Sequence, residues 1–262
     1  MPMICICSPQ GGSGRTMLAA NLASAYANRG NKVLLLDLNE QNALRLHFNL
    51  TLDDTHGFIP HAATTPDWGQ YIVKVDTNLY LLPYGEASRE QREAFQYLLS
   101  EKPETVRRSL SGITRHQGLV IIVDMPAGPH AALGALHELI DLHLVTLLAD
   151  GIAPALLEKI EKRAFLGMPL NKNGQHYFVL NKIDPRYEMN HDIGVYLRQR
   201  IGERLLGEIH QDSSVPAALA SQKSLRLYRP SSSALFDIDA LEQQLSHLLN
   251  ITVGNNDVLP TL

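Results

Sequence analysis

The stretch that decides the fold is Met3-Ile4-Cys5-Ile6-Cys7-Ser8-Pro9-Gln10-Gly11-Gly12-Ser13-Gly14-Arg15-Thr16. Its first five residues are apolar and predict a buried strand, and three glycines follow within the next seven positions. Apolar residues then recur at helical spacing over 16–28, and a second apolar strand over 33–36 ends at Asp37. The order strand, glycine loop, helix, strand predicts a parallel βαβ unit.

The same alternation continues along the chain. We expect strands at 79–82, 119–123, 142–148, 176–180 and 205–209, and helices at 89–99, 104–110, 133–140, 154–165, 191–200 and 238–249. The strands are continuously apolar, which means burial on both faces and predicts an α/β fold with a doubly wound, mostly parallel sheet between helices. No composition break marks a linker, so we expect one domain over 1–250 and a tail over 251–262. Residues 50–68 are expected to form a long loop.

Composition narrows the class of protein. Of 262 residues, 45% are hydrophobic and 19% are charged, and the net charge is −4, which argues against coating nucleic acid through bulk charge. Cys5 and Cys7 cannot form a disulfide framework, and on a strand they share one face as small buried groups. Neither a signal peptide nor an apolar run of about 18 residues is present, so we expect a cytoplasmic protein.

The glycine loop favours a bound polyphosphate. Backbone N–H groups and the N-terminus of the next helix point at the ligand, and glycines let the backbone approach closely. The Thr16 hydroxyl stands where a phosphate-bound Mg²⁺ takes a ligand. The strict pattern G-x-x-x-x-G-K-[ST] is not met, because Pro9 replaces the first glycine and Arg15 the lysine. The alternative is an ordinary glycine turn.

Two aspartates end neighbouring strands. Asp37 closes the second strand, and Asp124 closes the apolar run 119–123. Both are expected at the carboxyl edge of the sheet, where ligands bind in open α/β folds. We therefore predict Thr16, Asp37 and Asp124 as Mg²⁺ ligands, and Gly128 as a backbone donor to a γ-phosphate.

A fourth motif, Asn181-Lys182-Ile183-Asp184, follows another strand. N-K-x-D resembles the guanine-reading motif of GTPases, in which the aspartate pairs with the base. GTP is therefore an alternative to ATP, and a polar turn after a strand is the other alternative.

Together these elements resemble the MinD/ParA family of P-loop ATPases, in the loop 10–16, the D-x-x-x-Q of 37–41, the D-x-P-A-G of 124–128 and the strand end at Asn181. The resemblance implies ATP and Mg²⁺ as cofactors and places Asn181 against adenine. The implied nucleotide-binding residues are Gln10, Gly11, Gly12, Ser13, Gly14, Arg15, Thr16, Met17, Gly128 and Asn181.

Within the family, segments 44–49, 67–68, 81–85 and 209–212 resemble the branch that serves bacterial cellulose synthesis. That resemblance implies a homodimer required for cellulose synthesis and secretion. The implied partners are subunits of the cellulose synthase complex and a small accessory protein. It also implies a cytoplasmic chain, held at the inner membrane or cell pole only through partners, with no nucleic-acid role.

The departures from the family pattern concern hydrolysis. Gln10 replaces the signature lysine that reaches the partner's nucleotide, Arg15 the phosphate-binding lysine, and Met17 a hydroxyl residue. Asn39 stands where an aspartate positions water, and an amide cannot accept a proton as a carboxylate does. Only Asp124 and Asn39 are candidate catalytic residues. We therefore predict a nucleotide-dependent scaffold with slow or absent ATP hydrolysis.

Three alternatives stay open. The first is a ParA-type ATPase that positions DNA or a cell-pole complex, although we expect Arg198, Arg200 and Arg204 to form a solvated face. The second is a GTPase switch reading guanine through Asp184. The third is a structural adaptor with an inactive pocket. The eleven histidines show no metal-ligand spacing.

Overall fold

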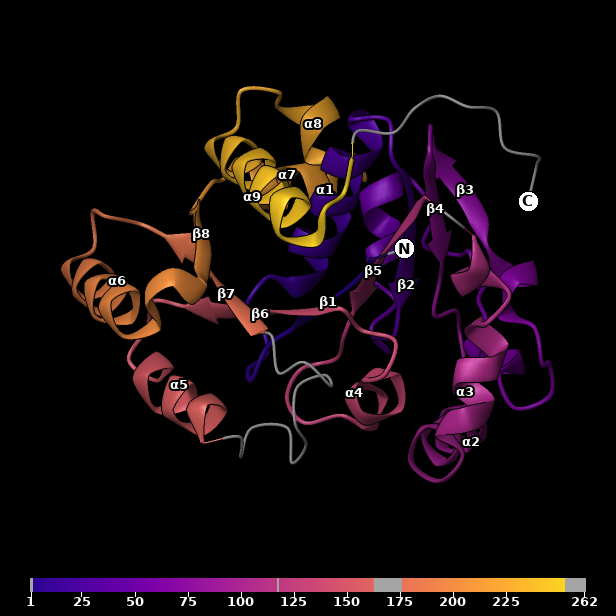
Figure 1. Cartoon of the computed structure of the whole chain (residues 1–262). Coiled ribbons are helices and arrows are strands. Elements are labelled where there is room, and N and C mark those ends of the chain that lie inside the picture. Colours follow the sequence, from indigo (N-terminus) through magenta and orange to yellow (C-terminus); the bar gives the residue numbers. More distant parts are fainter. Residues whose placement is uncertain (1, 117, 163–175, 253–262) are drawn as a thin grey trace.

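The computed structural model describes residues 2–116, 118–162 and 176–252, and its strands form one eight-stranded sheet (Figure 1). The strand order is β3-β4-β2-β5-β1-β6-β7-β8, and every neighbouring pair is parallel except β3 with β4. The strands are β1 (Met3–Cys7), β2 (Lys32–Asp37), β3 (Val73–Asp76), β4 (Leu79–Leu82), β5 (Leu119–Asp124), β6 (Leu142–Leu148), β7 (His176–Ile183) and β8 (Leu205–His210). The doubly wound, mostly parallel sheet is confirmed.

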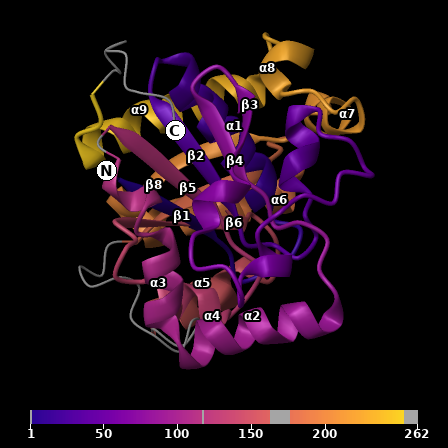
Figure 2. The same cartoon turned by 90° about the vertical axis from the view of Figure 1, so that its right-hand side faces the viewer.

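Helices cover both faces of the sheet (Figures 1 and 2). One layer consists of α1 (Arg15–Asn28), α7 (Ser214–Ala220), α8 (Leu225–Tyr228) and α9 (Ser233–Leu249). The other consists of α2 (Arg89–Glu101), α3 (Pro103–Leu110), α4 (Ala131–Leu136), α5 (Ala153–Glu161) and α6 (Glu188–Ile201). Short 3-10 turns lie at Leu44–Phe48, Ile59–His61, Trp68–Tyr71, Ile113–Arg115 and Gly202–Arg204.

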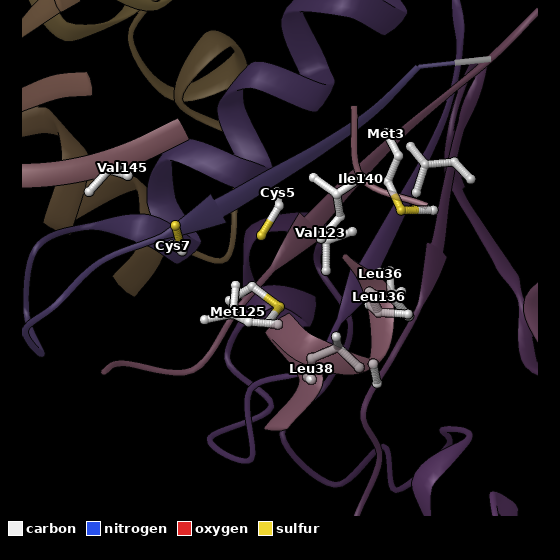
Figure 3. Close-up of a cluster of buried hydrophobic side chains, with 14 of the residues drawn as sticks. Met3, Cys5, Cys7, Leu36, Leu38, Val123, Met125, Leu136, Ile140 and Val145 are labelled. Atoms are coloured by element: carbon white, nitrogen blue, oxygen red, sulfur yellow. The ribbon is translucent and has the colours of Figure 1, made fainter. Parts of the chain in front are cut away.

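Each face of the sheet packs a separate core, because side chains alternate between faces along every strand. Figure 3 shows Cys5 and Cys7 of β1 in the same core as Met125 and Val145. Both thiols are fully buried and free, as the sequence predicts, and burial raises the pKa of Cys5 well above its ordinary value. The cysteines therefore serve as small apolar side chains.

Several predicted boundaries are wrong. The helix predicted over 133–140 is α4, which ends at Leu136. It begins earlier than predicted because the His130 side chain caps its N-terminus by accepting from the Ala132 N–H. Strand β3 and helices α7 and α8 were not predicted. The helix predicted over 154–165 is α5 as far as Glu161, and residues 163–165 lie outside the described residues. The same holds for residues 253–262 of the predicted tail.

The segment 50–68 is not simply an open loop. Phe58 and Trp68 are fully buried and lie against Phe95 of α2, with ring centroids 4.8 Å apart for Phe58–Trp68 and 5.7 Å for Phe58–Phe95. Hydrogen bonds from Phe58 N to Pro83 O and from Ile59 N to Tyr84 O join the segment to the residues after β4. These contacts hold it against the core.

The strand order reverses direction at β1, which lies between β5 and β6. The loop after β1 therefore opens at the topological switch point, where ligands bind in such sheets. In residues 2–116, 118–162 and 176–252, none of the helices combines the length and the apolar character that crossing a bilayer requires.

Candidate nucleotide-binding site

The glycine loop joins β1 to α1 in a conformation that needs glycine. Gly12 and Gly14 have φ of 72° and 89°, in the left-handed region, and Gly14 is the N-cap of α1. A Cβ at Gly14 would lie 2.1 Å from Nδ2 of Asn181. The loop therefore presents backbone, rather than side chains, at the start of a fourteen-residue helix.

The three predicted metal ligands come together at this point. Asp37 and Asp124 are register partners on β2 and β5, and both are fully buried. The Thr16 hydroxyl donates to Oδ2 of Asp124 at 2.7 Å, and the Asn39 N–H donates to Oδ1 of Asp37 at 2.9 Å. The other two carboxylate oxygens, Oδ1 of Asp124 and Oδ2 of Asp37, have no hydrogen-bond partner.

Unpaired buried carboxylates are unfavourable, and the pKa values of this pair reflect that cost. Burial raises the pKa of Asp124 to about 7, although the Thr16 hydrogen bond and the Arg15 charge act in the opposite direction. Burial, followed by the charge of Asp124, raises the pKa of Asp37 well above its ordinary value. A divalent cation would neutralise both groups.

The donor set fits Mg²⁺ rather than a cation held entirely by protein. Hard oxygen donors suit Mg²⁺, which is commonly bound through one or two carboxylates plus phosphate oxygens. Across the described ranges, no group of three or more His, Cys, Asp or Glu side chains gathers to hold a metal ion. A cation between Thr16, Asp37 and Asp124 would therefore depend on phosphate oxygens or water for its remaining ligands.

The residues after β7 hold the glycine loop from the other side. Nδ2 of Asn181 donates to the Ser13 carbonyl at 2.7 Å, and Nζ of Lys182 donates to the Gly12 carbonyl at 3.0 Å. Asn181 is only 1% exposed. The amide nitrogen of Asn181 is thus engaged with loop backbone, and its contact with adenine stays a prediction.

A groove with a volume of about 1080 Å³ opens beside this loop, beyond the carboxyl ends of β7 and β8. Among its lining residues are Lys182, Asp184, Arg186, Tyr187, Asp212 and Ser232. Since Lys182 both lines the groove and reaches Gly12, the groove is adjacent to the glycine loop.

Comparison with known proteins places the chain in a family. The model of the family "Cellulose biosynthesis protein BcsQ" matches residues 1–245. The chain belongs to the BcsQ family. The BcsQ of Salmonella typhimurium is 27% identical over 234 residues, covering 87% of this chain and 88% of the relative.

Two further similarities extend beyond BcsQ. An "Uncharacterized ATP-binding protein" of Methanocaldococcus jannaschii is 27% identical over 238 residues, covering 88% of this chain and 83% of the relative. The septum site-determining protein MinD of Pyrococcus horikoshii, solved in complex with Mg-ADP, has the same fold, with a TM-score of 0.73 and 22% identity. The match covers 95% of this chain and 98% of that one. The predicted MinD/ParA-like fold of this BcsQ-family chain is confirmed.

Arg15 of this BcsQ-family chain lies folded against the loop. Its Nη1 donates to the Gln10 carbonyl at 3.1 Å, its Nε has no partner, and the residue is 8% exposed. Burial lowers the pKa of Arg15, while the charge of Asp124 acts to raise it. Only Nη1 of the guanidinium is engaged by Gln10, and the partnerless Nε leaves a donor that a phosphate oxygen could accept from.

Three other predicted positions are engaged within the protein. Gln10 donates from Nε2 to Oδ2 of Asp150 at 3.3 Å, whose other oxygen accepts from backbone at the start of α5. The Gly128 N–H donates to the Ser8 carbonyl at 2.9 Å, so a bond to a γ-phosphate would have to replace that one. The Met17 carbonyl accepts from the Asn21 side chain at 2.8 Å.

Ser13 and Asn39 are two further polar side chains near the glycine loop. Ser13 is fully buried and its hydroxyl has no partner, so the loop holds a second open polar group besides the carboxylates. Asn39 is 6% exposed, and its Oδ1 accepts from the Gln41 N–H at 3.2 Å. The structure thus places Asn39 next to Asp37, as the sequence predicts. Its side-chain oxygen, however, accepts from the backbone of the turn that follows.

Arg45 is not among the predicted site residues. It is 7% exposed, and its guanidinium donates to the carbonyls of Thr51, Leu52 and Asp54 at 2.6–3.3 Å. This residue therefore fixes the segment that follows the Asp37 strand end. No local pattern marks it, because its acceptors are all backbone groups.

The basic residues over 198–204 are paired with acids. Arg198 contacts Glu208 at 2.6 Å, Arg200 contacts Glu161 at 2.7 Å, and Arg204 contacts Glu161 at 3.9 Å. These pairs reduce the positive field that nonspecific DNA binding needs.

Proposed function

We propose that this chain binds Mg²⁺-ATP, with the triphosphate along residues 10–16 and the base towards the groove after β7 and β8. The observation that carries the proposal is the pair of open, buried carboxylate oxygens on Asp37 and Asp124 beside the Thr16 hydroxyl. Thr16, Asp37 and Asp124 would hold a divalent cation, which would stabilise the ionised form of both carboxyl groups beside a bound phosphate. The Mg-ADP in the Pyrococcus MinD and the name of the Methanocaldococcus relative support the same ligand class.

In this proposal the chain's own groups provide the binding energy. The N–H groups at the start of α1 face the phosphates, and Arg15 exchanges the Gln10 carbonyl for a phosphate oxygen. Thr16 and the two aspartates would hold the metal, which would supply charge neutralisation at the phosphates. The Asn181 and Lys182 side chains keep the loop in its glycine-dependent shape.

Hydrolysis is slow or absent in this proposal. Asn39 occupies the position next to Asp37 where a carboxylate would orient the attacking water, and its amide oxygen already accepts from Gln41. Gln10, where the family has its signature lysine, carries no charge and donates to Asp150 of its own chain. Bound ATP then acts as a structural ligand that stabilises one state of the protein.

The biological role that fits these features is a nucleotide-dependent dimeric scaffold for bacterial cellulose synthesis and secretion. The BcsQ family match over residues 1–245 supports this role. As a single nucleotide-binding domain over 1–250, the chain would act on the cytoplasmic side, joining subunits of the cellulose synthase complex and a small accessory protein. It would reach the inner membrane or cell pole only through these partners.

The test is to purify the full chain, identify the co-purifying nucleotide, and measure mass in solution and turnover with and without Mg²⁺-ATP. We expect adenine nucleotide, a dimer with ATP, and turnover far below the roughly 1–100 s⁻¹ of fast phosphoryl-transfer enzymes. Turnover in that range would contradict the slow-hydrolysis part. A monomer with bound ATP would contradict the dimer, and salt-dependent binding to random duplex DNA would support the partition alternative instead.

A further inference from the structure

The residues of the Asn181–Asp184 motif contact two places, the glycine loop and the groove. Asn181 and Lys182 both bind carbonyls of the glycine loop. Asp184 instead lines the groove, at the point where β7 has ended. A carboxylate there is placed to contact the base of a nucleotide whose phosphates lie on the loop.

The Asp184 carboxylate is already filled on both oxygens. Arg186 donates from Nε to Oδ1 at 2.8 Å and from Nη2 to Oδ2 at 2.6 Å, and its backbone N–H also donates to Oδ1 at 3.1 Å. The Asp184 side chain is 7% exposed, whereas Arg186 is 82% exposed. Two parallel N–H groups on a carboxylate form the bidentate pair that gives the strongest geometric specificity.

The surrounding contacts keep the carboxylate in this position. The Asp184 N–H donates to Oδ1 of Asn190 at 2.8 Å, and Nδ2 of Asn190 donates to the Ala149 carbonyl at 3.0 Å. The turn after β7 is thereby tied to the end of β6. Asp212, across the groove, accepts from Ser232, Ser233 and the Ser214 N–H, so it too is engaged.

Guanine and the Arg186 guanidinium offer the same pattern to a carboxylate. The Watson–Crick edge of guanine presents N1–H and an amino N–H side by side, and a carboxylate accepts both. Adenine presents an acceptor at N1 and cannot form that pair. A carboxylate already in a bidentate pair with an internal guanidinium cannot accept the two guanine donors in the same geometry, so it gives guanine no advantage.

We propose that Arg186 is a specificity residue that occupies the guanine-reading position of Asp184 from within the chain, so that the groove selects adenine over guanine nucleotides. This inference rests on the proposed function, since it assigns the base preference of the same site. It also explains how an N-K-x-D sequence can belong to an ATP-binding protein: the first two residues hold the loop, and the aspartate is blocked.

The experiment measures the affinities of fluorescent ATP and GTP analogues, each with Mg²⁺, for the full-length wild type, Arg186→Ala, and Arg186→Ala combined with Asp184→Ala. The matched control is Arg200→Ala, which removes the same charge from a similar pair with Glu161 at the other end of α6. We expect the wild type to prefer ATP. Removing Arg186 frees both oxygens, so affinity for GTP relative to ATP should rise about tenfold or more, the range of one bidentate base contact.

The double variant should lose this gain, because the freed carboxylate is what reads guanine, and Arg200→Ala should leave the ratio at the wild-type value. An unchanged ratio in Arg186→Ala, or a gain that survives removal of Asp184, would overturn the inference while ATP binding stands. A wild type that prefers GTP would also overturn it. A wild type that binds neither nucleotide would instead defeat the proposed function.

Discussion

Two pairs of aspartates lie at the same edge of the sheet and differ in their partners. Beside α1, Asp37 and Asp124 are fully buried and each has an oxygen without a partner. At the groove, Asp184 accepts from Arg186 on both oxygens and Asp212 accepts from serines. The pKa values diverge accordingly: burial raises those of the first pair, while the Arg186 hydrogen bond lowers that of Asp184. Buried carboxylates with unpaired oxygens indicate a ligand site, whereas carboxylates paired within the chain indicate a structural role.

The largest effect is expected at Gly14, where the glycine loop contacts Asn181 of β7. Gly14→Ala places a Cβ 2.1 Å from Nδ2 of Asn181 at a φ of 89°, so the loop must move. We expect nucleotide affinity to fall at least about 100-fold, and stability to fall by about 1–3 kcal/mol from backbone strain. Titration with Mg²⁺-ATP and urea unfolding measure both. Gly151→Ala, where a Cβ meets nothing within 4 Å, is the control and should match the wild type.

The second largest effect is expected at the buried pair Asp37 and Asp124. Asp124→Asn removes one charge from the metal position, so Mg²⁺-dependent affinity for ATP should fall by about 10–100-fold, the usual cost of a disturbed metal site. Asp212→Asn, on the saturated side, should leave the Mg²⁺ dependence unchanged. Calorimetric titrations with and without Mg²⁺ give the comparison. Equal losses in the two variants would remove the distinction between the pairs.

A third effect concerns hydrolysis. Asn39→Asp adds a carboxylate next to Asp37, where it can accept a proton from water, and we expect ATP turnover to rise about tenfold or more. Phosphate release under single-turnover conditions measures the chemical step. Asn42→Asp, a nearby buried asparagine whose oxygen accepts from the Gly85 N–H, is the control. Turnover unchanged by Asn39→Asp would show that this residue does not limit hydrolysis.

The pH dependence of stability should differ in sign between the pairs. An acid whose pKa is raised on folding destabilises the protein as pH rises from about 4 towards 7, because the folded state holds the proton more tightly. Without nucleotide or Mg²⁺, Asp124→Asn should therefore stabilise the chain at pH 7.5 by on the order of 1 kcal/mol and have little effect near pH 4.

Asp212→Asn should act in the opposite direction. Hydrogen bonds from Ser232 and Ser214 outweigh burial and lower the pKa of Asp212, so its contribution is present at neutral pH and lost on acidification. Urea unfolding of both variants and the wild type at the two pH values decides the matter. Destabilisation by Asp124→Asn at pH 7.5 would contradict the assignment of an open, repulsive pair.

The smallest effect belongs to the scaffold. Ser232 caps α9 by accepting from the Leu235 N–H at 3.3 Å, and it also donates to Asp212 at 2.6 Å. Ser232→Ala should cost about 1 kcal/mol of stability, as N-cap losses usually do, without changing the Mg²⁺ dependence of binding. Thermal unfolding and titration test this. Loss of the Mg²⁺ dependence would place Ser232 in the ligand site.

Local sequence was enough to predict the part of the site built on strand ends. Continuous apolar strands fix a parallel sheet, and a parallel sheet brings Asp37 and Asp124 to one edge beside the Gly14 turn. Thr16 follows from its spacing after the glycines. These predictions needed only chain order and periodicity, which is why the register pair Asp37–Asp124 appears where it was expected.

Contacts between distant segments could not be predicted in this way. Lys182 contacts Gly12 and Gln10 contacts Asp150 across 170 and 140 residues of sequence, so both contacts depend on the tertiary fold. Arg45 binds carbonyls only six to nine residues away, but backbone acceptors leave no residue pattern to find. Strand β3 was not predicted because it is short and half exposed at the sheet edge, so its apolar pattern is weak. The N-K-x-D motif can be found in the sequence, but the pairing of Asp184 with Arg186 cannot be predicted from it.

The most direct test of the central claim is a crystal structure of the full chain with Mg²⁺ and a non-hydrolysable ATP analogue. The account predicts phosphates along residues 10–16, Mg²⁺ about 2.1 Å from the Thr16 hydroxyl oxygen, and the Arg15 guanidinium moved from the Gln10 carbonyl to a phosphate. A loop unchanged at saturating ligand, with Arg15 still bound to Gln10 and no metal near Asp124, would contradict it.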